Sequence, residues 1–225
     1  MPVIAYIVVA IAAYLIGSIP TGYLVAKAKG IDIQKVGSGN IGATNVFRIV
    51  GKPAGIFVLL MDALKGYAAC AFLPPCIFNW LAPHFSGIAT GFFAEPVDLQ
   101  FKFSALAGIS AVLGHNYTCW LKFKGGKGIA TTAGVYLALA PVALGIALAV
   151  FILTILITRY VSVGSLIAAV ALPMAVWFTK ENLFLRIVTI AFGAMAIFRH
   201  RKNIQRLMAG TESRIGEKTS TEAAK

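Results

Sequence analysis

Long apolar runs dominate this chain of 225 residues and restrict its possible folds more than any other feature. Hydrophobic residues make up 59% of the sequence, the mean hydropathy is +0.83, and 12% of residues are charged. A soluble domain carries about twice that charged fraction. Several runs approach or exceed the ~20 residues that a helix needs to cross the hydrocarbon core. Because the runs are continuously apolar rather than alternating, they exclude a membrane β-barrel and predict an all-α polytopic bundle.

The positions of lysine and arginine predict how these apolar runs are oriented. Residues 1–16 have no basic region before their apolar run and no cleavage site after it, so we expect a retained helix and not a signal peptide. Cations are enriched in cytoplasmic loops, and five of them follow the first run, which places the amino terminus outside. The five are Lys27, Lys29, Lys35, Arg48 and Lys52.

The same reasoning predicts seven transmembrane helices, with the carboxyl terminus in the cytoplasm. We expect them near residues 3–26, 53–72, 101–118, 163–179 and 183–197, with two short spans in 129–158 that turn near Pro141. Treating 129–158 as a re-entrant hairpin gives five spans with the same sidedness. Residues 73–100 contain no lysine or arginine and are expected to form an external loop with a re-entrant or interfacial segment.

The remaining composition limits domains and partners. Residues 1–209 are expected to form a single transmembrane catalytic domain, and the polar tail 210–225 is expected to be disordered. The three cysteines lack the spacing of a metal site, so no metal is predicted. The net charge is +12, and its lysines and arginines lie between membrane spans rather than on a soluble basic domain, which argues against a nucleic-acid partner. Such an excess of cations is typical of cytoplasmic loops, and it also suits an anionic ligand. Asp62 and Lys65 share a helix face and are expected to form a structural ion pair near the pocket wall.

Three polar stretches interrupt the apolar chain, and each places glycine or asparagine beside a cation. They are GSGNIGATNVFR at 37–48, FKGGKGIATT at 123–132 and FRHRKN at 198–203. Buried polar groups rarely lack partners, so these stretches are expected to face water, a substrate or one another. The predicted topology puts all three at the cytoplasmic face, where they would form a cationic, amide-rich pocket suited to phosphate.

The glycines of the first stretch spell G-x-G-x-x-G. A dinucleotide site requires a preceding strand in a βαβ unit, whereas this stretch lies between membrane helices, so we reject that reading and predict no cofactor. Glycines still permit tight turns that bring N–H groups close to an anion, and residues 43–49 are expected to start a short helix. A solvated connecting loop is the alternative. The candidate substrate-binding residues are Gly37, Gly39, Asn40, Thr44, Asn45 and Arg48.

The second stretch combines Gly125, Gly126, Lys127 and Gly128 with a following helix. Flexible N–H groups, a lysine and a helix amino terminus all favour an anion. It is not the Walker motif, because glycine and not serine or threonine follows Lys127. His115 and Asn116 lie upstream and are expected to line the same face, although an interior hydrogen-bonded histidine is the alternative for His115.

The third stretch contributes His200 and Asn203, which are three apart and so share a helix face. A plain topology anchor is the alternative. Ser165, with Ser162, is a fainter fourth contribution. Only eight carboxylates exist, and the sequence contains no G-x-S-x-G. The candidate protein bases are therefore His200 and His115. Otherwise the reaction takes its base from a substrate, or the protein is a transporter or exchanger of phosphorylated solutes.

Together the stretches resemble the bacterial membrane glycerol-3-phosphate acyltransferases that use acyl-phosphate. The matching segments are GSGNIGATNVFR, LGHNYTCWLKFKGGKGIATT and FRHRKNIQRL, with GSIPTGYL near the start and RYVSVGSL later. The resemblance covers essentially the whole chain and implies seven helices in the bacterial inner membrane. It also implies the first acylation of phospholipid synthesis. An acyl group would move from acyl-phosphate, and not from acyl-CoA or acyl-carrier protein, to the sn-1 hydroxyl of glycerol 3-phosphate, giving lysophosphatidate and inorganic phosphate.

The resemblance further implies which residues act. Ser38, Arg48, Lys127, His200 and Asn203 match the family's functional residues, and Ser165 matches another. It implies substrate-assisted catalysis, in which a substrate phosphate accepts the hydroxyl proton; a phosphate monoester dianion, with a second pKa near ~6, is a competent base at neutral pH. We expect a monomer whose partners are acyl-phosphate, glycerol 3-phosphate and membrane lipid, with the active site on the cytoplasmic face.

Overall fold

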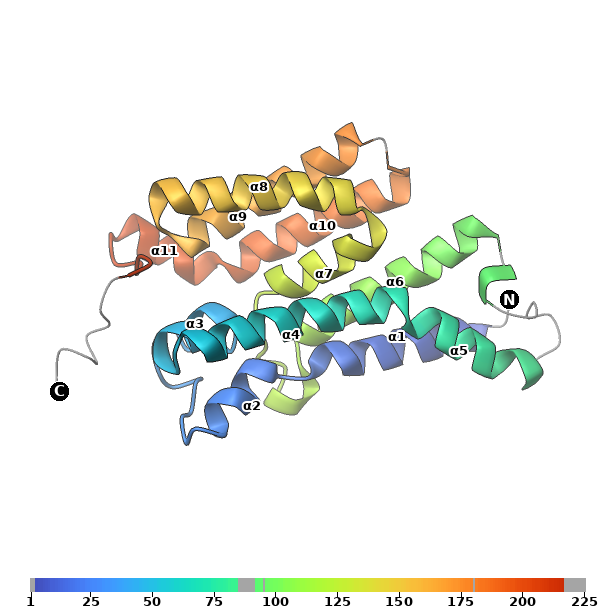
Figure 1. Cartoon of the computed structure of the whole chain (residues 1–225), viewed down its shortest axis with the longest axis horizontal. Helices are drawn as coiled ribbons and strands as arrows, with labels where there is room; N and C mark the ends of the chain where they lie inside the picture. The colour runs from blue at the N-terminus through green and yellow to red at the C-terminus, as the bar shows by residue number, and fades with distance from the viewer. Residues whose placement is uncertain (1–2, 85–91, 95, 180, 217–225) are drawn as a thin grey trace. The chain divides into compact units, whose positions relative to one another are not determined.

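The described residues of this computed structural model are helices joined by short loops (Figure 1). They comprise residues 3–84, 92–94, 96–179 and 181–216. The chain forms two compact units, Met1–Leu139 and Ala140–Lys225, and the single catalytic domain stays a prediction. The boundary falls at Ala140, whose φ of −153° is not helical. A residue before proline is disfavoured in the α conformation, so Pro141 explains the break.

The first unit contains seven α-helices and three short 3₁₀ turns in its described part. They are α1 (Val3–Ser18), α2 (Thr21–Lys27), α3 (Ala43–Ile49), α4 (Lys52–Ala71), α5 (Leu73–Leu81), η1 (Ala82–His84), η2 (Phe92–Ala94), α6 (Val97–Asn116), η3 (Cys119–Leu121) and α7 (Ile129–Leu139). The described part of the second unit contains α8 (Pro141–Thr158), α9 (Val161–Phe178), α10 (Leu183–Arg199) and α11 (Arg201–Met208).

Five helical segments are long and apolar enough to cross a membrane in the described part of the chain, or six if the bent pair α10 and α11 counts as one span. The prediction of an all-α, multi-pass membrane protein is therefore confirmed. The break near Pro141 and the short helix at 43–49 are also confirmed, since α7 ends at Leu139, α8 begins at Pro141, and α3 covers Ala43–Ile49. The seven crossings and the sidedness stay predictions.

The predicted first span, residues 3–26, corresponds to the apolar segment Val3–Lys27, within which the helix is interrupted. The chain breaks between Ser18 and Thr21, because Pro20 has no N–H to donate and disfavours helical conformation at Ile19. The carbonyl of Ile19 instead accepts a hydrogen bond from Lys65 Nζ of α4 at 3.0 Å. This break was predictable from Pro20, but the long apolar run concealed it.

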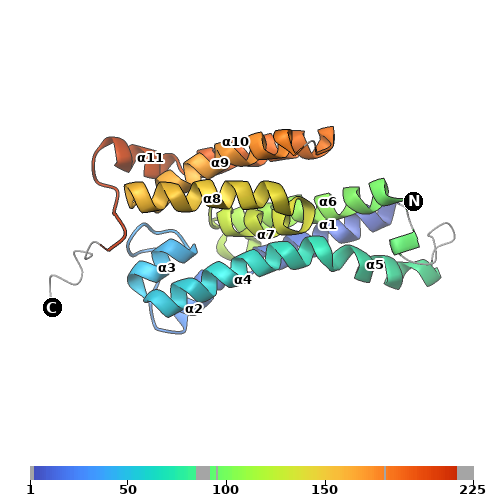
Figure 2. The ribbon, with the colours of Figure 1, turned by 45° about the horizontal axis from the view of Figure 1, so that its top comes forward.

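Helices occupy both ends of residues 73–100, which the sequence predicts to be an external loop with a re-entrant or interfacial segment: α5 covers Leu73–Leu81 and α6 begins at Val97. Figures 1 and 2 show α5 continuing from the end of α4, and the two form one apolar segment, Lys52–Leu81. Prolines near a helix start are tolerated, and Pro74 and Pro75 occupy that position in α5. Phe78 packs edge-on against Phe103 of α6, with ring centroids 4.5 Å apart. Residues 85–91 and 95 lie outside the described residues.

Glycines allow the closest helix contacts in the first unit. A Cβ at Gly134 of α7 would overlap the carbonyl oxygen of Ala63, and one at Gly66 of α4 would overlap that of Thr131. Small residues at such crossings let two backbones approach and are a common association device in membranes. This reciprocal contact fixes α7 against α4, and so it fixes the loop that precedes α7.

We expect Gly134→Ala to destabilise the protein by about 2 kcal/mol, because the added methyl overpacks the contact between α7 and α4. The measurement is thermal unfolding in detergent. Gly145→Ala on α8 is the matched control, since a Cβ there meets open space. It should leave stability unchanged or raise it slightly. Equal effects of the two substitutions would show that the close approach does not limit stability.

Candidate functional site

The loop before α3 is organised by one buried side chain, Asn45. Its Oδ1 accepts a hydrogen bond from the N–H of Ser38 at 3.0 Å, and its Nδ2 donates to the carbonyl of Asn40 at 2.9 Å. Nδ2 also lies within hydrogen-bond distance of the carbonyls of Ile33 and Val36. An amide group has two donor hydrogens, so these partners use the donors of Asn45 within the loop. Asn45 is therefore a loop organiser and not the substrate-binding group that the sequence predicts.

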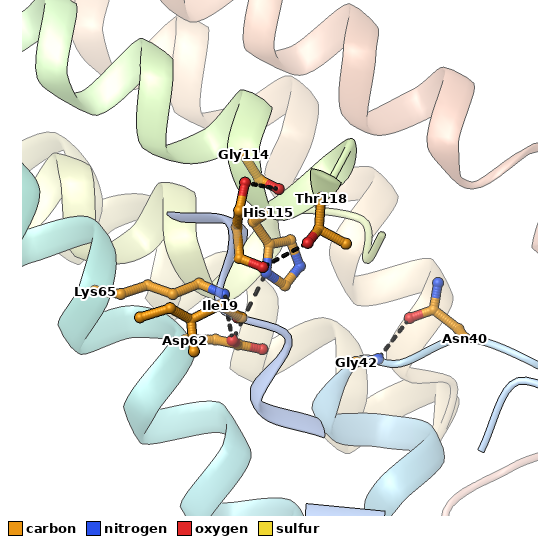
Figure 3. A network of polar contacts seen from close by, with 9 residues as sticks. Ile19, Asn40, Gly42, Asp62, Lys65, Gly114, His115 and Thr118 are labelled. Atoms are coloured by element: carbon orange, nitrogen blue, oxygen red, sulfur yellow. Dashed lines mark hydrogen bonds and ion pairs between the residues drawn. The ribbon is translucent and has the colours of Figure 1, made fainter. Parts of the chain in front are cut away.

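The other predicted residues of this loop fall into two groups. Gly37 and Gly39 adopt left-handed φ values of 58° and 68°, which glycine tolerates best. Asn40 Oδ1 accepts from the N–H of Gly42 at 2.8 Å and so closes a local turn (Figure 3). The exposed side chains are Ser38 and Thr44. Arg48 is half-buried in α3. Gly37, Gly39 and Asn40 thus set the conformation of the loop, whereas Ser38 and Thr44 expose polar side chains.

The glycine-rich loop before α7 is built directly on the end of α6. The N–H of Gly126 donates to the carbonyl of His115 at 2.9 Å, and the N–H of Gly125 donates to that of Asn116 at 3.2 Å. A Cβ at Gly125 would overlap the carbonyl of His115, and one at Gly126 would overlap its ring. These two N–H groups, predicted to face an anion, are therefore used inside the protein.

Other donors at this loop fit an anion better. The first N–H groups of a helix have no intrahelical acceptor and attract negative charge. The first helical bond of α7 runs from the N–H of Thr132 to the carbonyl of Gly128 at 2.7 Å, which leaves Ile129, Ala130 and Thr131 at the amino end. Lys127 is half-buried immediately before them.

Two fully buried polar side chains beside this helix start have no hydrogen-bond partner among the described residues. They are Asn116, whose Oδ1 would lie 2.7 Å from a Cβ at Gly128, and Thr131 in the first turn of α7. A buried amide or hydroxyl without a partner costs roughly 1–3 kcal/mol, so such groups point to a missing ligand or water. Thr131 was not among the predicted site residues, although its place after the GGKG sequence was a usable signal.

The backbone that leads into this loop is strained. Lys122 and Phe123 have φ values of 53° and 61°, in the left-handed region that non-glycine residues seldom occupy. Leu121, just before them, packs on the apolar cluster beneath the first loop. That cluster consists of Ala26, Ile33, Ile41, Val46 and Val58. Residues 33–46 and the segment before Gly125 therefore pack on the same apolar cluster, which supports both polar loops of the first unit.

A buried charged cluster includes His115, the residue that contacts Gly126 of the glycine-rich loop (Figure 3). Asp62 Oδ1 and Lys65 Nζ are 2.8 Å apart, which confirms the predicted ion pair, and His115 Nδ1 is 3.6 Å from the same oxygen. His115 is 5% exposed and Asn116 is completely buried. His115 is therefore an interior residue of this unit.

In the second unit, His200 and Asn203 begin α11. His200 Nδ1 lies 2.7 Å from the carbonyl oxygen of Ala196. A carbonyl can only accept, so Nδ1 carries a proton, and Nε2 is the nitrogen that gains or loses a second one. Both side chains are buried, with exposures of 2% and 5%. Ser165, another predicted site residue, donates its hydroxyl to the carbonyl of Val161 at 2.9 Å within its own helix.

Glu212 is a site residue that the sequence reasoning missed. Its carboxylate accepts from Asn203 Nδ2 and from Arg206 Nε, each at 2.6 Å. Burial by itself would raise the pKa of Glu212, but the hydrogen bonds from Asn203 and Arg206 hold it below its ordinary value of 4.5. A single carboxylate soon after a basic helix was the available signal.

Glu212 also changes the description of the tail. Disorder is predicted from residue 210, yet residues 210–216 make defined contacts. The N–H of Ile215 donates to the carbonyl of Arg159 at 2.8 Å, and Arg159 Nη2 donates back to the carbonyl of Ile215 at 2.9 Å. Arg214 Nε donates to the hydroxyl of Tyr160 at 2.9 Å. The hydrogen bonds lie in the turn between α8 and α9, which a reading of the tail alone cannot reveal. Residues 217–225 lie outside the described part.

The fold and these loops define the class of protein. It is a multi-pass, all-helical membrane protein with a glycine-rich loop at the start of a helix and unpartnered polar groups beside it. The model of the glycerol-3-phosphate acyltransferase family matches residues 7–210, so the chain belongs to this family.

Relatives and solved structures agree with that assignment. Proteins named glycerol-3-phosphate acyltransferase from Trichlorobacter lovleyi and Geobacter sulfurreducens are 46% and 44% identical over 203 residues, which cover 90% of this chain and 94% of each relative. The crystal structure of PlsY, an integral membrane glycerol 3-phosphate acyltransferase, in its glycerol 3-phosphate form has a TM-score of 0.79 at 33% identity over 97% of this chain and 98% of PlsY. The lysophosphatidic acid form has a TM-score of 0.76 at 34% identity over 94% and 95%.

Glu212→Gln should weaken the protein in a pH-dependent way. Because the folded-state pKa is lowered, ionised Glu212 contributes stability above about pH 4.5, and this contribution disappears as the pH falls through the lower folded-state value. Thermal midpoints of the parent and Glu212→Gln, measured between pH 7 and pH 3, should therefore differ most at neutral pH and converge in acid. Glu181→Gln, which alters a carboxylate elsewhere in the same unit, is the control. A constant difference across the range would show that the charge of Glu212 is not what stabilises this segment.

Proposed function

We propose that this protein transfers an acyl group from acyl-phosphate to the sn-1 hydroxyl of glycerol 3-phosphate. The products are 1-acyl-glycerol 3-phosphate, which is lysophosphatidate, and inorganic phosphate, in the first step of phospholipid synthesis. Membership of the glycerol-3-phosphate acyltransferase family supports the acceptor and the class of reaction. The acyl-phosphate donor rests on the chemistry of the loops.

The observation that carries the proposal is the pair of unpartnered buried groups, Asn116 and Thr131, beside Lys127 and the amino end of α7. A cation, helix N–H groups and neutral donors together match a phosphoryl group better than a neutral thioester. We assign this loop to the phosphoryl group of acyl-phosphate. Gly125 and Gly126 then serve to shape the loop, because their N–H groups are already hydrogen-bonded to α6.

The remaining predicted residues are assigned to the acceptor. We propose that Arg48 and Ser38 bind glycerol 3-phosphate. We assign His200 and Asn203 to the same substrate because their motif resembles that of the family. A guanidinium suits a phosphate because it offers several donors in one plane. Glu212 holds the amide of Asn203, because its carboxylate accepts a hydrogen bond from Nδ2 at 2.6 Å. Ser165, whose hydroxyl is bonded to its own helix, is retained as a weaker candidate.

The proposed chemistry needs positioning and charge neutralisation more than a protein nucleophile. The hydroxyl oxygen of glycerol 3-phosphate forms a bond with the acyl carbonyl carbon. The bond from that carbon to the bridging oxygen of acyl-phosphate breaks, and its electron pair leaves with the phosphate. A substrate phosphate dianion accepts the hydroxyl proton. Lys127 and the helix N–H groups stabilise the charge on the departing phosphate. His200, through Nε2, is the alternative base.

We further propose seven transmembrane helices, with the amino terminus outside and the carboxyl terminus inside. The five clear spans, the α10–α11 pair and the 11-residue apolar helix α7 together supply that number. The cations of residues 27–52 then lie in the cytoplasm, which is where glycerol 3-phosphate is available. The protein would act as a monomer in the bacterial inner membrane, with the acyl chain entering from the lipid.

The donor is tested with purified protein in detergent, glycerol 3-phosphate and either palmitoyl-phosphate or palmitoyl-CoA. We expect lysophosphatidate and free phosphate in equal amounts with palmitoyl-phosphate, and background formation of lysophosphatidate with palmitoyl-CoA. Product formed only with palmitoyl-CoA would overturn the donor assignment while leaving the acceptor in place.

Lys127→Ala should lower kcat/KM for palmitoyl-phosphate by at least about a hundredfold, because it removes a charge that stabilises the departing phosphate. Its thermal midpoint should stay near that of the parent, since Lys127 is only half-buried. Lys124→Ala is the matched control, because this exposed lysine lies in the same loop at a position without an assigned role. Similar activity of the two variants would remove Lys127 from the mechanism.

A further inference from the structure

The buried cluster of Asp62, Lys65 and His115, drawn in Figure 3, has no assigned role in the reaction, yet His115 contacts Gly126 of the glycine-rich loop. We propose that these three residues form a positioning network that fixes the conformation of residues 125–128, with the ring of His115 as the contact that transmits it. The inference rests on the proposed function, because it concerns the loop to which donor binding is assigned. None of the three is proposed to touch substrate.

Burying the charged groups of this cluster costs free energy. The side chains of Lys65 and Asp62 are 7% and 4% exposed in a membrane-spanning helix. Burying two charges costs free energy that their attraction recovers only with good geometry and further hydrogen bonds, so a buried pair is weak evidence for stability as such. Ionisable residues within membrane segments instead mark function more often than packing.

Lys65 and Asp62 each contact a further segment of the first unit. Lys65 Nζ, besides contacting Asp62, donates to the carbonyl of Ile19, which lies in the break between α1 and α2. Asp62 Oδ1 lies 3.6 Å from His115 Nδ1, near the end of α6. At that distance the contact is electrostatic rather than a hydrogen bond. The pair therefore connects α4 to the α1–α2 break and to the imidazole ring.

Hydrogen bonds between the ends of α6 and α1 fix the position of His115. Ser18 donates its hydroxyl to the carbonyl of Gly114 at 3.3 Å, and Thr118 donates its hydroxyl to the carbonyl of Ser18 at 2.5 Å. These hydrogen bonds attach the end of α6 to the end of α1 on both sides of His115. Residue 115 therefore has little freedom to move, and its ring has a defined direction.

His115 contacts the glycine-rich loop at Gly126. The ring of His115 occupies the space that a side chain at Gly126 would need, since a Cβ there would overlap Nε2 and lie 2.7 Å from Cε1. The backbone carbonyl of the same residue accepts from the N–H of Gly126 at 2.9 Å. Lys127 is the next residue. A small rotation of the ring would thus displace the lysine assigned to the phosphoryl group and weaken the binding of palmitoyl-phosphate.

A double-mutant cycle tests the contact between the ring and the loop. We expect Gly126→Ala to raise KM for palmitoyl-phosphate about tenfold, because the new methyl displaces the loop from the ring. In a His115→Ala background, which removes the ring, Gly126→Ala should change KM less than about twofold. Independent effects, with the tenfold change kept in both backgrounds, would overturn the proposal.

A second comparison separates positioning from simple stability. Asp62→Asn leaves Lys65 without its counter-charge and should lower the thermal midpoint, whereas Asp62→Asn with Lys65→Met removes both charges and should recover it. If the cluster positions the loop, KM for palmitoyl-phosphate in the stable double variant stays about tenfold above the parent while kcat changes less. A parental KM in that variant would show a purely structural pair and would overturn the proposal.

Two controls separate this outcome from failure of the proposed function. Asp98→Asn removes an exposed ion pair with Lys102 on α6, and it should leave KM at the parental value. Lys127→Ala tests the loop itself. Undiminished activity in Lys127→Ala would refute donor binding by the loop, whereas its loss, combined with a parental KM in the charge-free double variant, would refute the positioning network alone.

Discussion

The hydrogen bonds from Gly125 and Gly126 to the carbonyls at the end of α6 are the contact on which the candidate site of the first unit depends. A helix that ends inside a membrane protein leaves carbonyl groups without intrahelical partners, and each must find one. Here the following loop supplies the donors. That use explains why glycines are needed, because any side chain at these positions would overlap residue 115.

In the second unit a carboxylate holds the polar side chains in place. Glu212 returns from beyond α11 to accept hydrogen bonds from Asn203 and Arg206, and the hydrogen bonds of Ile215 to Arg159 secure the segment that carries it. In both units, a residue assigned to substrate is therefore held by a buried group that is not itself assigned to substrate. Such supporting groups set the geometry on which positioning and electrostatic catalysis depend.

Much of the fold was predictable because it depends on local pattern. Apolar runs of membrane length predicted the long helices, Pro141 predicted the break after α7, and the spacing of Asp62 and Lys65 predicted their ion pair. Details inside these segments were not predicted. The helix breaks before Pro20 within the first apolar segment, and α5 continues the helix that precedes it, although the prolines and glycines of 73–100 suggested a loop.

The sequence by itself determined the class of protein, the family through its three polar stretches, and the small set of residues available for phosphate chemistry. Only the tertiary structure decided how those residues divide between holding the loops and facing a ligand. Asn45 and the N–H groups of Gly125 and Gly126 are used internally, whereas Asn116 and Thr131 keep unused hydrogen-bonding groups. The physical reason is that a polar group's partner often lies many residues away, as Asn116 does from Gly125, so its availability depends on packing that no local pattern contains.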